Sequence, residues 1–319
     1  MYNMKNKYRK LCETEKSIPL FNQAWWLDSV CGEDNWDVCL VEKGNNIIAS
    51  MPYYIKSKYR LKISTQPPLT QFLGPWIKQT DVKYSKKLGQ EKDILKTLFS
   101  KHPKVHNFQQ NWNHVNSNWL PIYWLGYNQS TRYTYRINNL SDLDNVYKNT
   151  LANIKTDIKK ASNKYLLAIK TDLPFSDFFK LNQLTFSRQS MVMPYTEEFV
   201  SSLINKAKLR NQAKWFIAQD SDGRNHAGVL IVWDENSAYY LMGGGDPELR
   251  NSGATSLCMW EAIKFSATVT KSFDFEGSML EPVERFFRAF GAEQTPYFSI
   301  SKTNSKILKV RNVLKELIR

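Results

Sequence analysis

The order of predicted elements between residues 213 and 301 constrains this chain more than any other feature. Three extended segments come first, and a helix, a strand, a second helix and a last strand follow them. Because strands and helices alternate after the opening series, the segment predicts a mixed α/β layer structure. The predicted ranges are 213–219, 227–234, 237–243, 252–268, 272–275, 282–290 and 294–301.

The first 130 residues show a comparable alternation. Their predicted elements are a helix at 21–30, strands at 37–42 and 46–55, an extended run at 57–64, a loop at 66–75, a helix at 89–101, and strands at 105–110 and 120–125. Further elements are a strand at 132–137 and helices at 153–163, 175–188, 197–210 and 305–317. Seven of the ten tryptophans precede residue 131, and a length of 319 residues favours two domains of about 100–200 residues. We therefore expect one domain at 1–130 and a second at 131–319.

The charge balance points to polyanionic partners. The chain has 44 Lys and Arg residues against 30 Asp and Glu residues, a formal net charge of +14 that is spread over both halves. This excess favours nucleic acid, nucleotide phosphates or an anionic membrane face as partners. Surface lysines that only keep a protein in solution would give the same balance.

Export and membrane-spanning signals are not visible in the sequence. No apolar run approaches the roughly 18 residues that cross a bilayer, and no apolar segment follows the basic residues near the start. The four cysteines show no CxxC spacing, which indicates a reducing compartment. We expect a cytoplasmic protein.

A glycine-rich segment follows the strand at 237–243 and opens the helix at 252–268. Glycines remove side chains where a ligand or another backbone approaches closely, and the N–H groups at a helix N-terminus attract a pyrophosphate. The segment is either such an anion site or an ordinary loop before a helix. Its candidate residues are Gly243, Gly244, Gly245, Arg250, Ser252, Gly253 and Ala254.

Several motifs occur in an order typical of one family. They read FNQAWWLDSV at 21–30, LANIKTDIKKASNKY at 151–165, FDFEGS at 273–278, FFRAFGAE at 286–293 and TPYF at 295–298. In this order they resemble the Fem-type branch (FemAB-like, methicillin-resistance-factor-like) of the GNAT acyltransferase superfamily. The resemblance implies two tandem GNAT-like domains, each a mostly antiparallel central sheet flanked by helices.

The resemblance also implies an N-acyltransferase of cell-envelope polysaccharide synthesis. An acyl or aminoacyl group would pass from a thioester co-substrate, acyl-CoA or acyl carrier protein, to an amine of a nucleotide- or lipid-linked sugar; no cofactor would stay bound. Replacing Gly253 by valine should then weaken donor binding and leave the fold largely intact. The chain has no room for the family's helical-hairpin insertion, and no lysine directly follows the helix of Trp25 and Trp26. Both departures disfavour the first alternative, an aminoacyl-tRNA-dependent peptidoglycan-type peptide ligase; a non-catalytic module that binds anionic ligands is the second.

Acyl transfer to an amine requires a base and a polarised donor carbonyl. Strand-end N–H groups near Met242 to Gly245 are candidates for the oxyanion site. Asp274 and Glu276 are the candidate catalytic carboxylates, and we favour Glu276 because the strand opens into a loop at Gly277. The alternative is that these carboxylates cap the next helix or pair with Arg285 or Arg288.

The first half contains a possible binding surface for the acceptor. Basic and other residues alternate over 55–63, so a strand there would present its cations on one face, either to phosphates or to solvent as an edge strand. The loop at 66–75 could line an acceptor cleft or be packed. The candidate substrate-binding residues are Lys56, Lys58, Arg60, Lys62, Gln66 and Trp76.

Metal and thiol chemistry are not favoured. Pro103 breaks the helix that would bring His102 and His106 to one face, so no metal site is expected. Cys258 is expected in the core. The anionic partners that remain are the acceptor, with tRNA, an acyl carrier protein and a peripheral anionic membrane as further possibilities.

Overall fold

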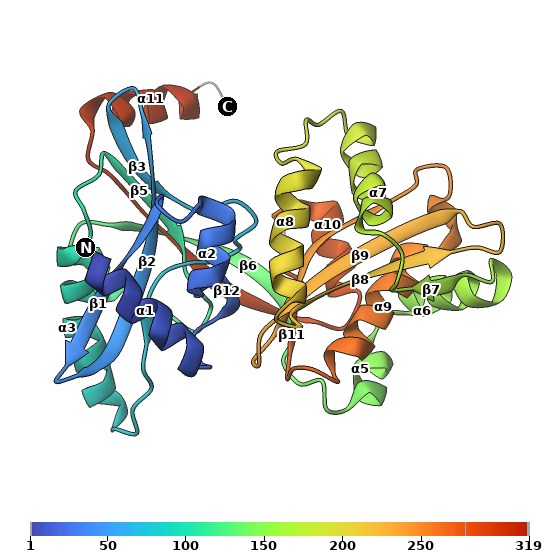
Figure 1. The fold of residues 1–319 in the computed structure, drawn as a ribbon, viewed down its shortest axis with the longest axis horizontal. Coiled ribbons are helices and arrows are strands. Elements are labelled where there is room, and N and C mark those ends of the chain that lie inside the picture. Colours follow the sequence, from blue (N-terminus) through green and yellow to red (C-terminus); the bar gives the residue numbers. More distant parts are fainter. Residues whose placement is uncertain (1, 278, 318–319) are drawn as a thin grey trace. The chain divides into compact units, whose positions relative to one another are not determined.

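The computed structural model describes residues 2–277 and 279–317, which divide into two compact units (Figure 1). Unit 1 comprises Met1–Arg132 and Pro296–Arg319, and unit 2 comprises Tyr133–Thr295. The chain passes from unit 1 to unit 2 between Arg132 and Tyr133, close to the domain boundary expected after residue 130. The domain boundary stays a prediction. The last residues join unit 1 because strand β12 (Glu293–Thr303) pairs with β5 (Asn107–Asn111).

The sheet of unit 1 has the strand order β1-β2-β3-β5-β12. The antiparallel neighbours β1, β2 and β3 span Trp36–Lys43, Asn46–Lys58 and Leu61–Thr65. β3 is parallel to β5, and β5 is antiparallel to β12. A short strand, β4 (Trp76–Ile77), pairs with β2. The sheet is therefore mixed and mostly antiparallel, as expected.

The hairpin of β2 and β3 corrects the expected basic strand. The chain reverses at Tyr59 and Arg60, whose φ angles of 49° and 63° are those of a two-residue type I′ turn. Lys62 is paired with Ser57, so Lys62 and Lys56 lie on opposite faces of the hairpin. The single cationic face over 55–63 is therefore wrong, because the turn inverts the alternation.

Five helices complete the described part of unit 1. They are α1 (Tyr2–Thr14), α2 (Ala24–Cys31), α3 (Tyr84–Lys101), α4 (Leu120–Tyr123) and α11 (Lys306–Leu317), with a 3-10 turn at Leu20–Asn22. Leu98 and Phe99 of α3 are buried in one cluster with Phe108 and Trp112. The strand expected at 120–125 is wrong, because Pro121 lies in the first turn of α4, where its missing N–H removes no helical hydrogen bond.

The sheet of unit 2 has the order β6-β11-β10-β9-β8-β7. These strands span, in chain order, Asn128–Ile137, Ala168–Lys170, Ala213–Gln219, Asn225–Trp233, Ala238–Gly245 and Phe273–Asp274. β10 and β11 are parallel, and the other pairs are antiparallel. The strands β8-β9-β10-β11-β6 thus repeat the order of unit 1, which is three antiparallel strands, a parallel neighbour and an antiparallel last strand, and β7 adds a further antiparallel strand beside β8.

Helices α7 and α9 cover opposite faces of the unit 2 sheet. On β9, Val229 and Ile231 belong to one buried cluster with Leu257 and Cys258 of α9. Gly228 directly precedes Val229 and therefore lies on the opposite face, towards α7, where a Cβ would touch Phe178 and Leu181. The helices are α5 (Leu143–Asn149), α6 (Ala152–Lys159), α7 (Phe175–Arg188), α8 (Glu197–Lys208), α9 (Ala254–Ser266) and α10 (Glu281–Arg288), with a π-helical turn at Lys160–Lys164 and a 3-10 turn at Arg250–Ser252.

Candidate active site

The parallel strands β10 and β11 separate after two pairs of residues. Ala238 is paired with Phe273 and Tyr239 with Asp274, and β10 then continues to Gly245 beside β9 only. The register of β10 on β9 shifts between Tyr240 and Met242, so one extra residue bulges from β10 just past the separation. Glu276 follows β11 at this same place, which brings the favoured carboxylate to the point where the two strands part.

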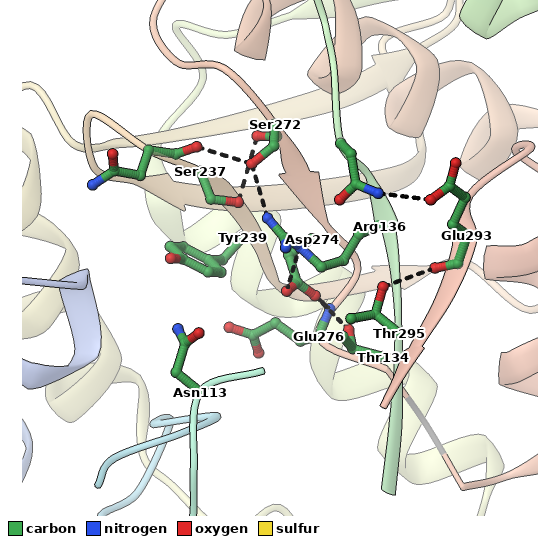
Figure 2. A network of polar contacts seen from close by, with 12 residues as sticks. Asn113, Thr134, Arg136, Ser237, Tyr239, Ser272, Asp274, Glu276, Glu293 and Thr295 are labelled. Atoms are coloured by element: carbon green, nitrogen blue, oxygen red, sulfur yellow. Dashed lines mark hydrogen bonds and ion pairs between the residues drawn. The ribbon is translucent and has the colours of Figure 1, made fainter. Parts of the chain in front are cut away.

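Asp274 is buried at the centre of a polar network (Figure 2). Its carboxylate accepts hydrogen bonds from the Thr134 hydroxyl and, over 2.8 Å, from the backbone N–H of Glu276. The other carboxylate oxygen lies 3.4 Å from Nε of Arg136, whose Nη2 donates to Ser272. Burial raises the pKa of Asp274, and the nearby Arg136 cation opposes that rise. Asp274 is therefore placed to hold the backbone of Glu276.

Glu276 is half-buried and has an unusual backbone. Its φ of 58° lies in the left-handed region, which costs a non-glycine residue about 1–2 kcal/mol. Gly277 follows with φ 60°, and a Cβ there would overlap the backbone of Tyr133 and Thr134. Burial, and secondly the charge of Asp274, raise the pKa of Glu276 well above 4.5. One of its carboxylate oxygens, Oε1, is buried, and the raised pKa makes this group a stronger base than an ordinary carboxylate.

The glycine-rich end of β10 packs against helix α7, and Gly244 makes the closest approach. A Cβ on Gly244 would overlap the backbone of Leu181, and Nδ2 of Asn182 donates to the carbonyl of Gly243 over 2.7 Å. The N–H of Gly245 donates to the Thr185 hydroxyl over 3.1 Å. Of the N–H groups expected to serve a ligand, that of Gly245 is therefore used in the contact between β10 and α7.

The N-terminus of α9 is packed against α6. Gly253 has φ 80°, and a Cβ on it would overlap the backbone of Asp157. The Asp157 carboxylate accepts a hydrogen bond of 3.4 Å from the Ser256 hydroxyl in the first turn of α9, where the helix dipole favours an anion. The close approach of the α6 backbone thus explains the glycine at 253, and the phosphate site expected there stays a prediction. Of the residues predicted there, Ser252 and Ala254 are buried and Arg250 is exposed.

A model of the acetyltransferase (GNAT) domain family matches residues 148–286, all of them in unit 2. Unit 2 carries a GNAT domain. Among curated protein sequences, none matches the chain.

Solved structures extend the likeness over both units. FemX has a TM-score of 0.68 at 11% identity, covering 92% of this chain and 95% of its own. L-PGS from Bacillus licheniformis has a TM-score of 0.56 at 10% identity (97% and 96% covered), and a tandem GNAT protein from the clavulanic acid biosynthesis pathway has 0.53 at 8% (95% and 96%). At these identities the likeness concerns the fold, and it confirms the expected resemblance to Fem-like proteins and the tandem GNAT-like architecture.

Two candidate substrate-binding residues of unit 1, Gln66 and Trp76, make hydrogen bonds within that unit. The amide of Gln66 donates to the carbonyl of Thr70 and accepts from the N–H of Asn111, so it holds the loop closed. Trp76 is buried, and its Nε1 donates to the Ser17 hydroxyl over 2.9 Å. This geometry favours a packed loop, and a substrate-binding role for either residue stays a prediction.

The described residues form no candidate metal site, and the thiol of Cys258 is not a candidate nucleophile. No group of three or more His, Cys, Asp or Glu residues there is arranged to hold a metal ion. Burial raises the pKa of Cys258 to about 12, so this thiol stays protonated inside α9.

Several residues around the candidate site were missed by the sequence analysis. They are Thr134, Arg136, Asp157, Asn182 and Thr185, and all of them contact the site from other elements. The one signal in the sequence was Arg136 in the strand predicted at 132–137. Its neighbours Tyr135 and Ile137 are buried, and an arginine among buried residues calls for a counter-ion.

Proposed function

We propose that this protein is a GNAT-type acyltransferase in which Glu276 is the general base for an acceptor amine. The observation that carries this proposal is the place of Glu276: a half-buried carboxylate with a raised pKa, just beyond the separation of the two parallel strands. The matching GNAT family supports acyl transfer as the reaction class. Asp274 is a positioning residue in this proposal, since it holds the N–H of Glu276.

The proposed reaction needs one proton acceptor and one oxyanion site. The acceptor nitrogen attacks the donor carbonyl carbon, a C–N bond forms, and the C–S bond of a thioester breaks to release the thiol. Glu276 takes the proton that the amine loses. N–H groups of β10 between Met242 and Gly245 would stabilise the negative oxygen, although that of Gly245 already donates to Thr185.

The acceptor in this proposal is the amine of a nucleotide- or lipid-linked sugar used in cell-envelope polysaccharide synthesis in the cytoplasm. Its phosphates agree with the net charge of +14. For the donor we keep two candidates. A thioester of coenzyme A or of an acyl carrier protein agrees with the GNAT match.

An aminoacyl-tRNA donor is favoured by one specific observation. The carboxylate of Asp157 accepts a hydrogen bond from Ser256 in the first turn of α9, beside the place where the pyrophosphate of coenzyme A was expected. An ester donor that brings no pyrophosphate to this turn avoids the repulsion between Asp157 and a phosphate.

The test is a transfer assay with each donor class. Labelled acyl-CoA, acyl carrier protein and aminoacyl-tRNA are incubated with the protein and a panel of amino-sugar nucleotides, and products are followed by mass spectrometry. Glu276→Gln should lower kcat by about 10²–10⁴-fold, because general base catalysis contributes that much.

The matched control is Glu248→Gln, an exposed carboxylate in the loop after β10 of the same unit. It should leave kcat unchanged. Equal rates for wild type and Glu276→Gln would remove the proposed base. Salt-sensitive ligand binding without turnover of any donor would instead favour a non-catalytic anion-binding module.

A further inference from the structure

Helix α11 of unit 1 exposes an apolar stripe. Ile307, Val310 and Leu314 follow one another at spacings of three and four residues, so they share one face of the helix. They are 76%, 61% and 53% exposed, whereas Leu308 is buried. A helix that buries one side and leaves large aliphatic side chains on another has an unfilled hydrophobic surface.

The tip of the β2–β3 hairpin belongs to the same end of unit 1 (Figure 1). His106 connects the two elements: its N–H donates to the Lys62 carbonyl over 2.8 Å, and its own carbonyl accepts from the N–H groups of Asn304 and Ser305 just before α11. At the hairpin tip, Tyr59 is 85% exposed and Arg60 is exposed beside it. We call residues 56–62 and 306–317 the basic end of unit 1.

Charge is concentrated in the basic end. Residues 56–62 contain four basic and no acidic residues, and 306–317 contain four basic and one acidic, which is a net +7 from 19 residues. Half of the chain's formal net charge of +14 therefore lies in these two segments. Lys306 and Lys309 are exposed beside the apolar stripe.

We propose that the basic end of unit 1 binds the surface of an anionic bilayer. Aliphatic side chains would enter the boundary between headgroups and acyl chains, and the lysines would contact anionic headgroups, as amphipathic interfacial helices do. Contact of this kind is peripheral. None of the helices formed by the described residues is long and apolar enough to span a membrane.

Other occupants fit the basic end less well. A second copy docked face to face would place two clusters of net +7 against each other, which like-charge repulsion opposes. Nucleic acid would satisfy the lysines and leave the aliphatic stripe in water, because phosphate backbones offer it no apolar partner. An anionic lipid surface satisfies both features together.

Vesicle sedimentation tests the proposal with the full chain. Vesicles of phosphatidylcholine with and without phosphatidylglycerol are used, and the bound fraction is measured against lipid concentration. Wild type should bind only the anionic vesicles. Lys306→Gln/Lys309→Gln should weaken that binding by about 30-fold, since each lysine near the surface contributes about 1 kcal/mol, and Val310→Ser/Leu314→Ser should weaken it at least about tenfold.

Lys83→Gln/Lys86→Gln is the matched control, because it removes two exposed lysines at the start of α3 in the same unit. It should bind within about twofold of wild type. Thermal unfolding checks that each variant is folded. The proposal is overturned if wild type ignores anionic vesicles, if the control weakens binding as much as the α11 variants, or if those variants abolish self-association or RNA binding and leave vesicle binding unchanged.

Discussion

Units 1 and 2 share a strand order but differ in what they place beside the parallel pair. In unit 1, β3 and β5 are parallel, and β5 carries the amides Gln109, Gln110 and Asn111. Gln110 is buried and donates to the carbonyl of Pro52. In unit 2, β11 and the turn after it carry Asp274 and Glu276, whose pKa values are both raised. The second unit therefore has carboxylates at this place, whereas the first has amides and the buried imidazole of His102, whose Nε2 lies 3.3 Å from the Ser64 hydroxyl. The shared topology does not by itself decide where chemistry occurs.

The helices that precede the two parallel strands differ as well. α3 of unit 1 begins at an exposed Lys83 and Tyr84, whereas α9 of unit 2 begins at a buried Gly253 against α6. The N-terminus of α3 faces water, and that of α9 packs against the carboxylate and the backbone of Asp157.

The largest expected effect is the loss of stability when a buried charge of unit 2 is removed, compared with removal of a buried amide of unit 1. Asp274→Asn leaves the Arg136 guanidinium without its counter-ion, which should lower the free energy of unfolding by about 3–5 kcal/mol. It also removes a charge that raises the pKa of Glu276, so the acid limb of any pH–rate profile should move to lower pH. Denaturant unfolding and the pH–rate profile measure the two effects.

The counterpart in unit 1 is Gln110→Met, which removes only a neutral donor. It should cost about 1–3 kcal/mol, the penalty of one unsatisfied carbonyl. If Asp274→Asn costs no more than Gln110→Met, the Arg136 pair does not distinguish the units.

A pair of glycine substitutions tests the two helix starts. Gly253→Ala places a Cβ on the backbone of Asp157 at φ 80°, and should destabilise the protein by about 2–4 kcal/mol. This outcome would replace the expectation that Gly253→Val leaves the fold intact. Gly89→Ala in α3 meets no atom within 4 Å and should stabilise by about 0.5–1 kcal/mol. Thermal unfolding reports both, and a stabilising Gly253→Ala would show that α9 is open.

The smallest effect is an opposite response of the two units to acid. His102 of unit 1 has its pKa lowered from 6.5 to about 4 by burial, so its contribution to stability is lost as pH falls from 6.5 toward 4. Glu276 of unit 2 has its pKa raised above 4.5, so the folded state favours the protonated acid. That contribution is present below pH 4.5 and is lost as pH rises through the raised pKa.

Acidification from pH 6.5 to 4.5 should therefore loosen unit 1 and tighten unit 2. Hydrogen exchange of β5 and of β9, corrected for the intrinsic pH dependence, measures each unit. His102→Phe should abolish the response of unit 1. Glu276→Gln should reduce the response of unit 2, of which Asp274, whose pKa is also raised, keeps a part, and neither variant should change the other unit. Parallel responses of the two units would contradict the assignment.

Much of the fold was predictable because it depends on local pattern. Helix α7 and strand β8 have the bounds that periodicity gives, 175–188 and 213–219. The hairpin at Tyr59 and Arg60 was not predictable in the same way, because neither residue carries the Asn-Gly signature of a type I′ turn. The register with β3 supplies the constraint that holds these two residues at positive φ.

The sequence by itself determined the alternation of strands and helices, the positions of the glycines and the candidate carboxylates, since these follow from residue type and spacing. Tertiary structure alone decided what each of them does. Thr134 and Asp274 are 140 residues apart and share a hydrogen bond, and Asp157 reaches the first turn of α9 from 99 residues before Ser256. Burial and the charge of Asp274 raise the pKa of Glu276, and the backbone of Asp157 lies against Gly253 at the start of α9. Both effects depend on residues that only the folded chain brings together.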